Sequence, residues 1–164
     1  MGRAFEPVVT KQVKDQNAYF TVRWSRVLPA DKRLINEKVP SVGGIFELYA
    51  VDKNNTLNLI GRGRAYYGGI RNTLRDFIDP LFPRTLGGTR VPHDAKLAFR
   101  YSCTASHEDM SDVLFFFAAR APRRHDEDSG GEPDTGESST EVEPSGRYRI
   151  IYVNEVAKDR LVTI

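Results

Sequence analysis

Cysteine and long apolar runs are both scarce in this chain of 164 residues. The single cysteine, Cys103, cannot form an intramolecular disulfide, and it excludes a zinc site built from several cysteines. The longest apolar run, residues 113–119, is far too short to span a bilayer. The first ten residues, MGRAFEPVVT, lack the apolar core of a secretion signal. These absences predict a soluble, cytoplasmic domain that has no membrane partner.

Acidic charge is concentrated in one segment. Residues 126–143 contain eight acidic side chains and no lysine or arginine. The other residues carry 24 basic side chains against 14 acidic ones, so their net charge is +10 although the whole chain has only +2. Such a basic body attracts polyanions, of which nucleic acid is the commonest inside cells. We therefore expect DNA or RNA as the partner; the alternative is that the charges only keep the protein soluble.

The acidic segment belongs to a longer stretch that is poor in apolar residues. Residues 123–146 hold Gly, Ser, Pro and acids with one aliphatic side chain, Val142. Such a composition buries too little surface to offset the entropy lost on ordering. We expect a disordered loop inside a single domain over residues 1–164, from which the chain returns to form a strand within residues 147–156.

The remaining pattern predicts an α+β fold. Alternating or β-branched runs predict five strands, at residues 19–24, 45–51, 57–60, 97–103 and 148–153. Apolar residues at helical spacing predict a helix over 70–77 that ends before Pro80. Ser106 and Asp109 form a capping box that opens a second helix. We expect one small mixed sheet with two principal helices, extended by the terminal strands.

The stretch GRGRAYYGGIRNTLR, residues 61–75, combines arginine, glycine and tyrosine without any acid. Arginines four apart project from one face of a helix, glycines at a helix N-terminus expose N–H groups to phosphate, and tyrosines stack on bases. The alternative is a tight glycine turn with inward tyrosines and solvated arginines. The candidate nucleic-acid site comprises Arg62, Arg64, Tyr66, Tyr67, Gly68, Gly69, Arg71 and Arg75.

A second candidate site lies on the helix that follows Ser106. Glu108 and Asp112 are four residues apart, so both carboxylates share one face and could hold a hydrated Mg²⁺. The alternative is that these acids stabilise the helix dipole without any metal.

Two short motifs and the order of the elements resemble the GIY-YIG nuclease domain. Gly44-Ile45-Phe46 matches the first motif in position, and Leu59-Ile60-Gly61 matches the second. The resemblance covers about residues 39–122. It implies that Arg71 or Arg75 is the family's arginine and that Asp112 replaces its metal-binding glutamate. The whole chain also looks like an uncharacterised bacterial family built on this core.

The signature tyrosines of that family are replaced here by Phe46 and Leu59, which cannot transfer a proton. The sequence therefore favours nucleic-acid binding by a degenerate nuclease-like domain without cleavage. The first alternative is an Mg²⁺-dependent phosphodiesterase in which Tyr49, or the pair Tyr66 and Tyr67, supplies the missing hydroxyl. In that alternative Arg71 or Arg75 stabilises the phosphate, and Asp112 and Glu108 bind the metal. The second alternative is a protein-interaction module that joins its basic face and the aromatic helix, residues 115–117, to an acidic partner.

Overall fold

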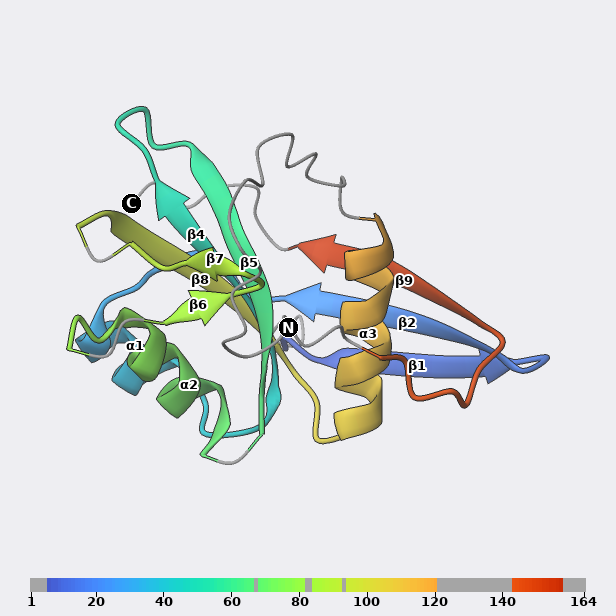
Figure 1. Ribbon diagram of the computed structural model, residues 1–164. Coiled ribbons are helices and arrows are strands. Elements are labelled where there is room, and N and C mark those ends of the chain that lie inside the picture. The colour runs from blue at the N-terminus through green and yellow to red at the C-terminus, as the bar shows by residue number, and fades with distance from the viewer. Residues whose placement is uncertain (1–5, 67, 82–83, 93, 121–142, 158–164) are drawn as a thin grey trace, which may run out of the picture.

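The computed structural model describes residues 6–66, 68–81, 84–92, 94–120 and 143–157 (Figure 1). The strands are β1 (Val9–Lys14), β2 (Asn17–Trp24), β3 (Leu28–Pro29), β4 (Gly44–Val51), β5 (Leu57–Ala65), β6 (Thr85–Leu86), β7 (Thr89–Arg90), β8 (Lys96–Cys103) and β9 (Ile150–Ala157). The helices are α1 (Lys32–Lys38), α2 (Gly69–Ile78) and α3 (His107–Arg120). The α+β class expected from the sequence is confirmed.

The first sheet has four strands in the order β3-β8-β4-β5, with β4 antiparallel to both β5 and β8. Alternate residues of β4 point to opposite faces of this sheet. Phe46 and Leu48 pack in the core beneath α1 and α2, whereas Ile45 packs with residues of β2 and α3. Because both faces are covered, β4 is buried over almost its whole length.

The second sheet has three strands in the order β1-β2-β9, and α3 packs on one face of it (Figure 1). In β2, Ala18, Phe20, Val22 and Trp24 alternate with more exposed residues and face α3, as the alternating pattern predicts. Strand β9 returns from far along the chain and pairs with β2 in parallel.

This grouping differs from the single extended sheet that we expected. The terminal strands pair with each other, and in the described part of the chain one isolated bridge, Val8 to Cys103, links the two sheets. The reason is that α3 needs an apolar surface to cover, and the buried side of β2 and β9 supplies it.

The predicted helices are confirmed. Helix α2 ends at Ile78 before Pro80, and α3 begins where the Asp109 N–H donates to Ser106 Oγ over 3.2 Å. The short helix α1, whose N-cap is Asp31, was not expected. Over the described ranges, no helix has both the length and the apolar character needed to cross a membrane.

Residues 121–142, which include most of the expected disordered loop 123–146, lie outside the described residues, so disorder there stays a prediction. Residues 143–146 are described, and for them the expectation of a disordered loop is corrected. Ser145 is held on α3: its N–H donates to Asp112 Oδ1 over 2.7 Å, and its hydroxyl donates to Asp112 Oδ2 over 2.8 Å.

Candidate functional site

The glycine pair before α2 makes a turn that other residues would strain. Gly68 and Gly69 have φ angles of 77° and 76°. A Cβ on Gly69 would also lie only 2.5 Å from the carbonyl carbon of Ser41. Here the structure agrees with the tight glycine turn proposed as an alternative.

The backbone donors at this turn are already used. The Ile70 N–H donates to the Val42 carbonyl over 2.9 Å, and the Gly69 N–H reaches the Tyr66 carbonyl over 3.4 Å. These two N–H groups are therefore not free for phosphate, contrary to the expectation from the sequence. The proposed anion binding on α2 is therefore argued from its side chains.

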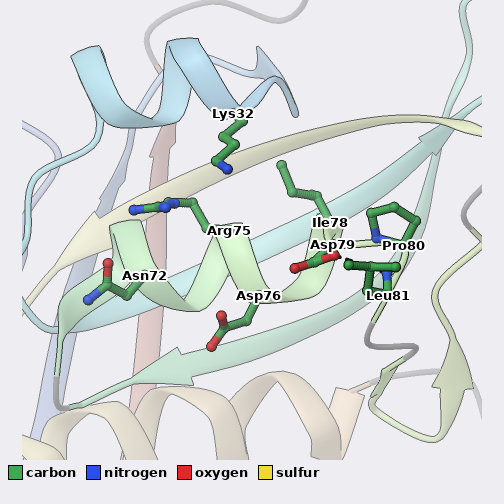
Figure 2. Close-up of a pocket in the computed structure, with 8 residues that line it drawn as sticks. All are labelled: Lys32, Asn72, Arg75, Asp76, Ile78, Asp79, Pro80 and Leu81. Carbon is green, nitrogen blue, oxygen red and sulfur yellow. Dashed lines mark hydrogen bonds between the residues drawn. The ribbon is translucent and has the colours of Figure 1, made fainter.

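Two cations from different helices meet beside α2. Lys32 of α1 and Arg75 of α2 line an open hollow of about 530 Å³ (Figure 2). Neither side chain has an ion-pair partner among the described residues. Arg71 lies one turn before Arg75, and its Nε donates to the Val39 carbonyl over 2.7 Å. We call Lys32, Arg71 and Arg75 the α1–α2 face.

The acids that line the same hollow have partners of their own. Asp76 lies 3.7 Å from Arg84, and Asp79 accepts a hydrogen bond from the Leu81 N–H over 2.9 Å. In Figure 2, Asp76 points away from Lys32 and Arg75. The positive charge of the α1–α2 face is therefore only partly offset within the hollow.

Arg62 and Arg64 lie on the other side of the four-stranded sheet, so the predicted cluster is divided in two. Both belong to β5, where arginine alternates with Gly61 and Gly63. The glycines face the core, because a Cβ would approach Leu86 to 2.9 Å at Gly61 and Phe46 to 2.5 Å at Gly63. The stretch Gly61–Ala65 is thus a strand with small residues on its crowded side, and its arginines point the opposite way.

On that opposite side, arginines surround a buried carboxylate. Glu47 of β4 is 2% exposed, and Arg100 Nε on β8 donates to it over 2.7 Å. Arg62 lies 3.4 Å from Glu47, with its guanidinium 4.5 Å above the ring of Phe117. Sequence reasoning missed this network. The available signal was one glutamate inside an otherwise apolar strand, since such an acid needs a partner when buried.

The network continues to the second sheet. Glu155 of β9 accepts a hydrogen bond from Trp24 Nε1 over 2.8 Å and lies 3.5 Å from Arg100. The Arg100 guanidinium is 4.5 Å above the Trp24 ring. We call these five side chains the Glu47 network. It joins Arg62 of β5, Glu47 of β4, Arg100 of β8, Trp24 of β2 and Glu155 of β9. Their charges are balanced internally, so the arrangement is structural.

Tyr66, one of the two tyrosines of the predicted site, already has close neighbours around its ring. The Tyr66 ring stacks on His107 with 4.1 Å between centroids, and the Arg64 guanidinium lies 5.2 Å from it. Arg64 also donates to Ser111 Oγ over 3.1 Å. A base could stack on Tyr66 only by competing with these neighbours. Tyr67 lies outside the described residues.

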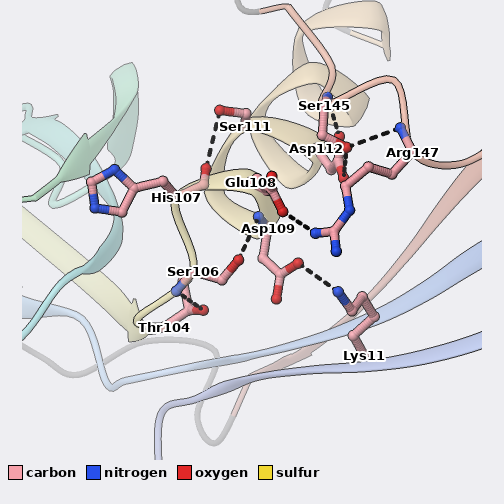
Figure 3. A network of polar contacts seen from close by, with 10 residues as sticks. All are labelled: Lys11, Thr104, Ser106, His107, Glu108, Asp109, Ser111, Asp112, Ser145 and Arg147. Atoms are coloured by element: carbon pink, nitrogen blue, oxygen red, sulfur yellow. Dashed lines mark hydrogen bonds and ion pairs between the residues drawn. The ribbon is translucent and has the colours of Figure 1, made fainter.

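The acidic side chains at the start of α3 are partnered by protein groups (Figure 3). Asp112 is 0% exposed and takes its two hydrogen bonds from Ser145. Glu108 pairs with Arg147, and Asp109 pairs with Lys11 Nζ at 2.9 Å. Among the described residues, no three His, Cys, Asp or Glu side chains are grouped so as to hold a metal. Nothing in this geometry supports the predicted Mg²⁺ site at Asp112 and Glu108.

The residues proposed for catalysis do not converge. Tyr49 is on the face of β4 that carries Glu47, away from Arg71 and Arg75. Burial, and then the charge of Glu47, raise the pKa of Tyr49 far above its ordinary value, so the hydroxyl stays protonated. Phe46 packs on Phe77 of α2, with centroids 5.6 Å apart. Leu59 is 40% exposed on β5.

The fold and these contacts describe an α+β domain with two main sheets, a two-stranded sheet of β6 and β7, and a cationic surface on α1 and α2. The chain belongs to a protein family described as "Uncharacterised protein", which matches residues 8–164 and so includes both sheets. No curated protein and no solved structure matches the chain. The resemblance to GIY-YIG nucleases therefore stays a prediction from the motifs and the order of the elements.

Proposed function

We propose that the protein binds the phosphate backbone of a nucleic acid on the α1–α2 face and does not cleave it. One observation carries this proposal: Lys32 and Arg75 line one open hollow without an ion-pair partner in the described part of the chain. Unpaired cations beside one another repel, and a phosphate between them removes that repulsion.

Two further contacts support the proposal. The hydrogen bond from Arg71 Nε to Val39 holds that guanidinium in place, so less side-chain entropy is lost when its other donors meet a phosphate. The nearest acids, Asp76 and Asp79, are engaged with Arg84 and with the Leu81 N–H. They compete less with an incoming phosphate than free carboxylates would.

Several contacts argue against cleavage. An Mg²⁺-dependent phosphodiesterase needs carboxylates with open lone pairs and a hydroxyl near the bound phosphate. Asp112 already accepts two hydrogen bonds, and Glu108 pairs with Arg147. The Tyr49 hydroxyl belongs to the other side of the sheet from Arg75. Binding without reaction is the function that fits this arrangement.

The test is fluorescence anisotropy of labelled single-stranded and duplex DNA and RNA, titrated with the full chain over a salt series. We expect the double variant Lys32→Ala, Arg75→Ala to flatten the slope of log affinity against log salt by about two units if each side chain contacts one phosphate. The matched control is Lys53→Ala, Lys96→Ala, which removes the same charge from exposed positions elsewhere.

An unchanged slope in the first variant, or an equal change in both variants, would remove the α1–α2 face from the binding site. Cleavage of any substrate that is stopped by EDTA and by Asp112→Asn would contradict the absence of catalysis. Comparison of the DNA and RNA titrations identifies the preferred polyanion.

A further inference from the structure

A second hollow, of about 520 Å³, lies between the C-terminal half of α3 and the start of β9. Its walls are mainly apolar and include Phe115, Phe116, Ile150 and Ile151. Phe115 is 37% exposed and Ile150 is 43% exposed. We call this hollow the α3–β9 groove. Apolar side chains gathered at an open groove are typical of a surface that binds a partner.

The charges at the groove have one sign. Arg120 at the end of α3 and Arg149 just before β9 are the charged residues that line it. The Arg120 guanidinium lies 3.9 Å above the ring of Phe116, and neither arginine has an ion-pair partner among the described residues. A partner that fits this groove therefore carries negative charge beside an apolar group.

Strand β9 also offers an open edge. Within the described chain it pairs only with β2, so the N–H and C=O groups along its other edge have no partner strand. Glu155 ties β9 to Trp24 and Arg100, which holds the strand in place before any partner arrives. A preformed edge strand can accept an extended peptide through backbone hydrogen bonds, with side-chain pockets giving specificity.

From these three features we propose that the α3–β9 groove binds an extended acidic peptide of a partner protein. The peptide adds to the open edge of β9, places an apolar side chain among Phe115, Phe116 and Ile150, and pairs its carboxylates with Arg120 and Arg149. This site is separate from the α1–α2 face, and it does not depend on nucleic-acid binding there.

The direct test is anisotropy of a labelled peptide of about ten residues that alternates glutamate with leucine, long enough to pair with most of β9. We expect Arg120→Glu, Arg149→Glu in the full chain to weaken binding by about ten-fold or more. The control Lys53→Glu, Lys96→Glu makes the same charge change away from the groove and leaves the affinity within about two-fold. Equal losses in the two variants would overturn the proposal, since the attraction would then be non-specific.

The apolar contact is tested with Phe115→Ser. It should weaken binding about ten-fold, whereas Leu59→Ser, at a similarly exposed position of β5, should not. Thermal unfolding of each variant shows whether the fold is retained. If Phe115→Ser is folded and binds like the parent chain, the groove is not the peptide site.

Strand addition is tested with the same peptide N-methylated at every residue, which keeps the side chains and removes the backbone donors of both edges. The proposal predicts loss of binding, and undiminished binding would overturn it.

Two further results would also overturn the proposal of a peptide site. One is that the groove variants weaken binding of a single-stranded oligonucleotide and not of the peptide. The other is that the peptide binds only after the eight acids of residues 126–143 are replaced by their amides, because the occupant would then come from the chain itself.

The two sites are distinguished by testing the variants of each site with the ligand of the other site. Lys32→Ala, Arg75→Ala should leave peptide affinity unchanged, and Arg120→Glu, Arg149→Glu should retain the oligonucleotide salt slope to within about one unit. If both pairs of variants weaken both ligands equally, the proposal of a separate peptide site fails.

Discussion

The two faces of the four-stranded sheet use the same residue type under opposite conditions. On one face Arg62 and Arg100 surround the buried carboxylate of Glu47, and with Glu155 beside Arg100 the charges are balanced. On the other face Arg75 and Lys32 line an open hollow without an ion-pair partner in the described residues. The difference shows that an arginine-rich sequence is not itself a binding signal, because its neighbours decide whether the charge is available.

The largest effect expected from this comparison follows Glu47→Ala. The substitution leaves the Arg62 and Arg100 guanidiniums facing each other without their carboxylate, so we expect the free energy of unfolding to fall by about 3–5 kcal/mol. Urea denaturation measures it. The control is Glu37→Ala, which breaks an exposed pair with Arg33 and should cost under about 0.5 kcal/mol. Similar losses in both variants would refute the structural role of the Glu47 network.

A smaller loss is expected for Asp112→Ala. The substitution leaves the Ser145 N–H and hydroxyl without their acceptor, and we expect a cost of about 1–3 kcal/mol. Glu108→Ala on the same helix removes only the exposed pair with Arg147 and should cost under about 1 kcal/mol. If Asp112 served mainly as a metal ligand, the substitution would cost little in EDTA and more in Mg²⁺, which urea denaturation in both solutions would reveal.

Partly buried groups of the four-stranded sheet also predict a pH dependence. Burial raises the pKa of the Cys103 thiol from 9.0 to about 11. The unfolded chain therefore loses this proton first, so stability from this group is complete below pH 9 and is lost as pH rises toward 11. Tyr49 and Tyr101, whose pKa values are also raised by burial, add to the loss at still higher pH.

The measurement for Cys103 is urea denaturation at about pH 8 and about pH 10 for the parent chain and for Cys103→Ala. We expect a smaller drop in stability for the variant over this interval. An identical drop in both would show that the thiol ionises at a similar pH in the folded and unfolded chains.

The smallest stability effect is expected on the open face. Lys32→Ala, Arg75→Ala should change the free energy of unfolding by less than about 0.5 kcal/mol, because neither side chain has a hydrogen bond or ion pair in the described structure. The same variant should lose salt-dependent oligonucleotide binding. A loss of stability comparable to that of Glu47→Ala would mean that both faces are structural.

Much of the fold could be predicted because local pattern and burial agree there. In β2, apolar residues from Ala18 to Trp24 alternate, and in α3 the box of Ser106 and Asp109 marks the helix start; both elements lie where the pattern predicts them. The pairing of β2 with β9 could not be predicted, because strand patterns indicate which face is buried but not which strand is the neighbour.

The candidate site was predicted only in part. The pair Arg71 and Arg75 on one helix followed from helical spacing and is confirmed as a placement. The grouping of Arg62 and Arg64 with them was wrong, because the predicted strand ended at residue 60 whereas β5 continues to Ala65. A side chain at Gly61 or Gly63 would collide with Leu86 or Phe46, which are distant in the sequence. Lys32 was missed because α1 was not expected.

The sequence by itself determined the α+β class, the basic character of the body outside the acidic segment, and most strands and helices. These depend on composition and on periodicities of a few residues. Only the tertiary structure decided which arginines are neutralised by Glu47 and which remain open, and that Asp112 holds Ser145. Those outcomes depend on contacts between residues far apart in the chain, because desolvation and pairing, more than residue type, set whether a charge is available.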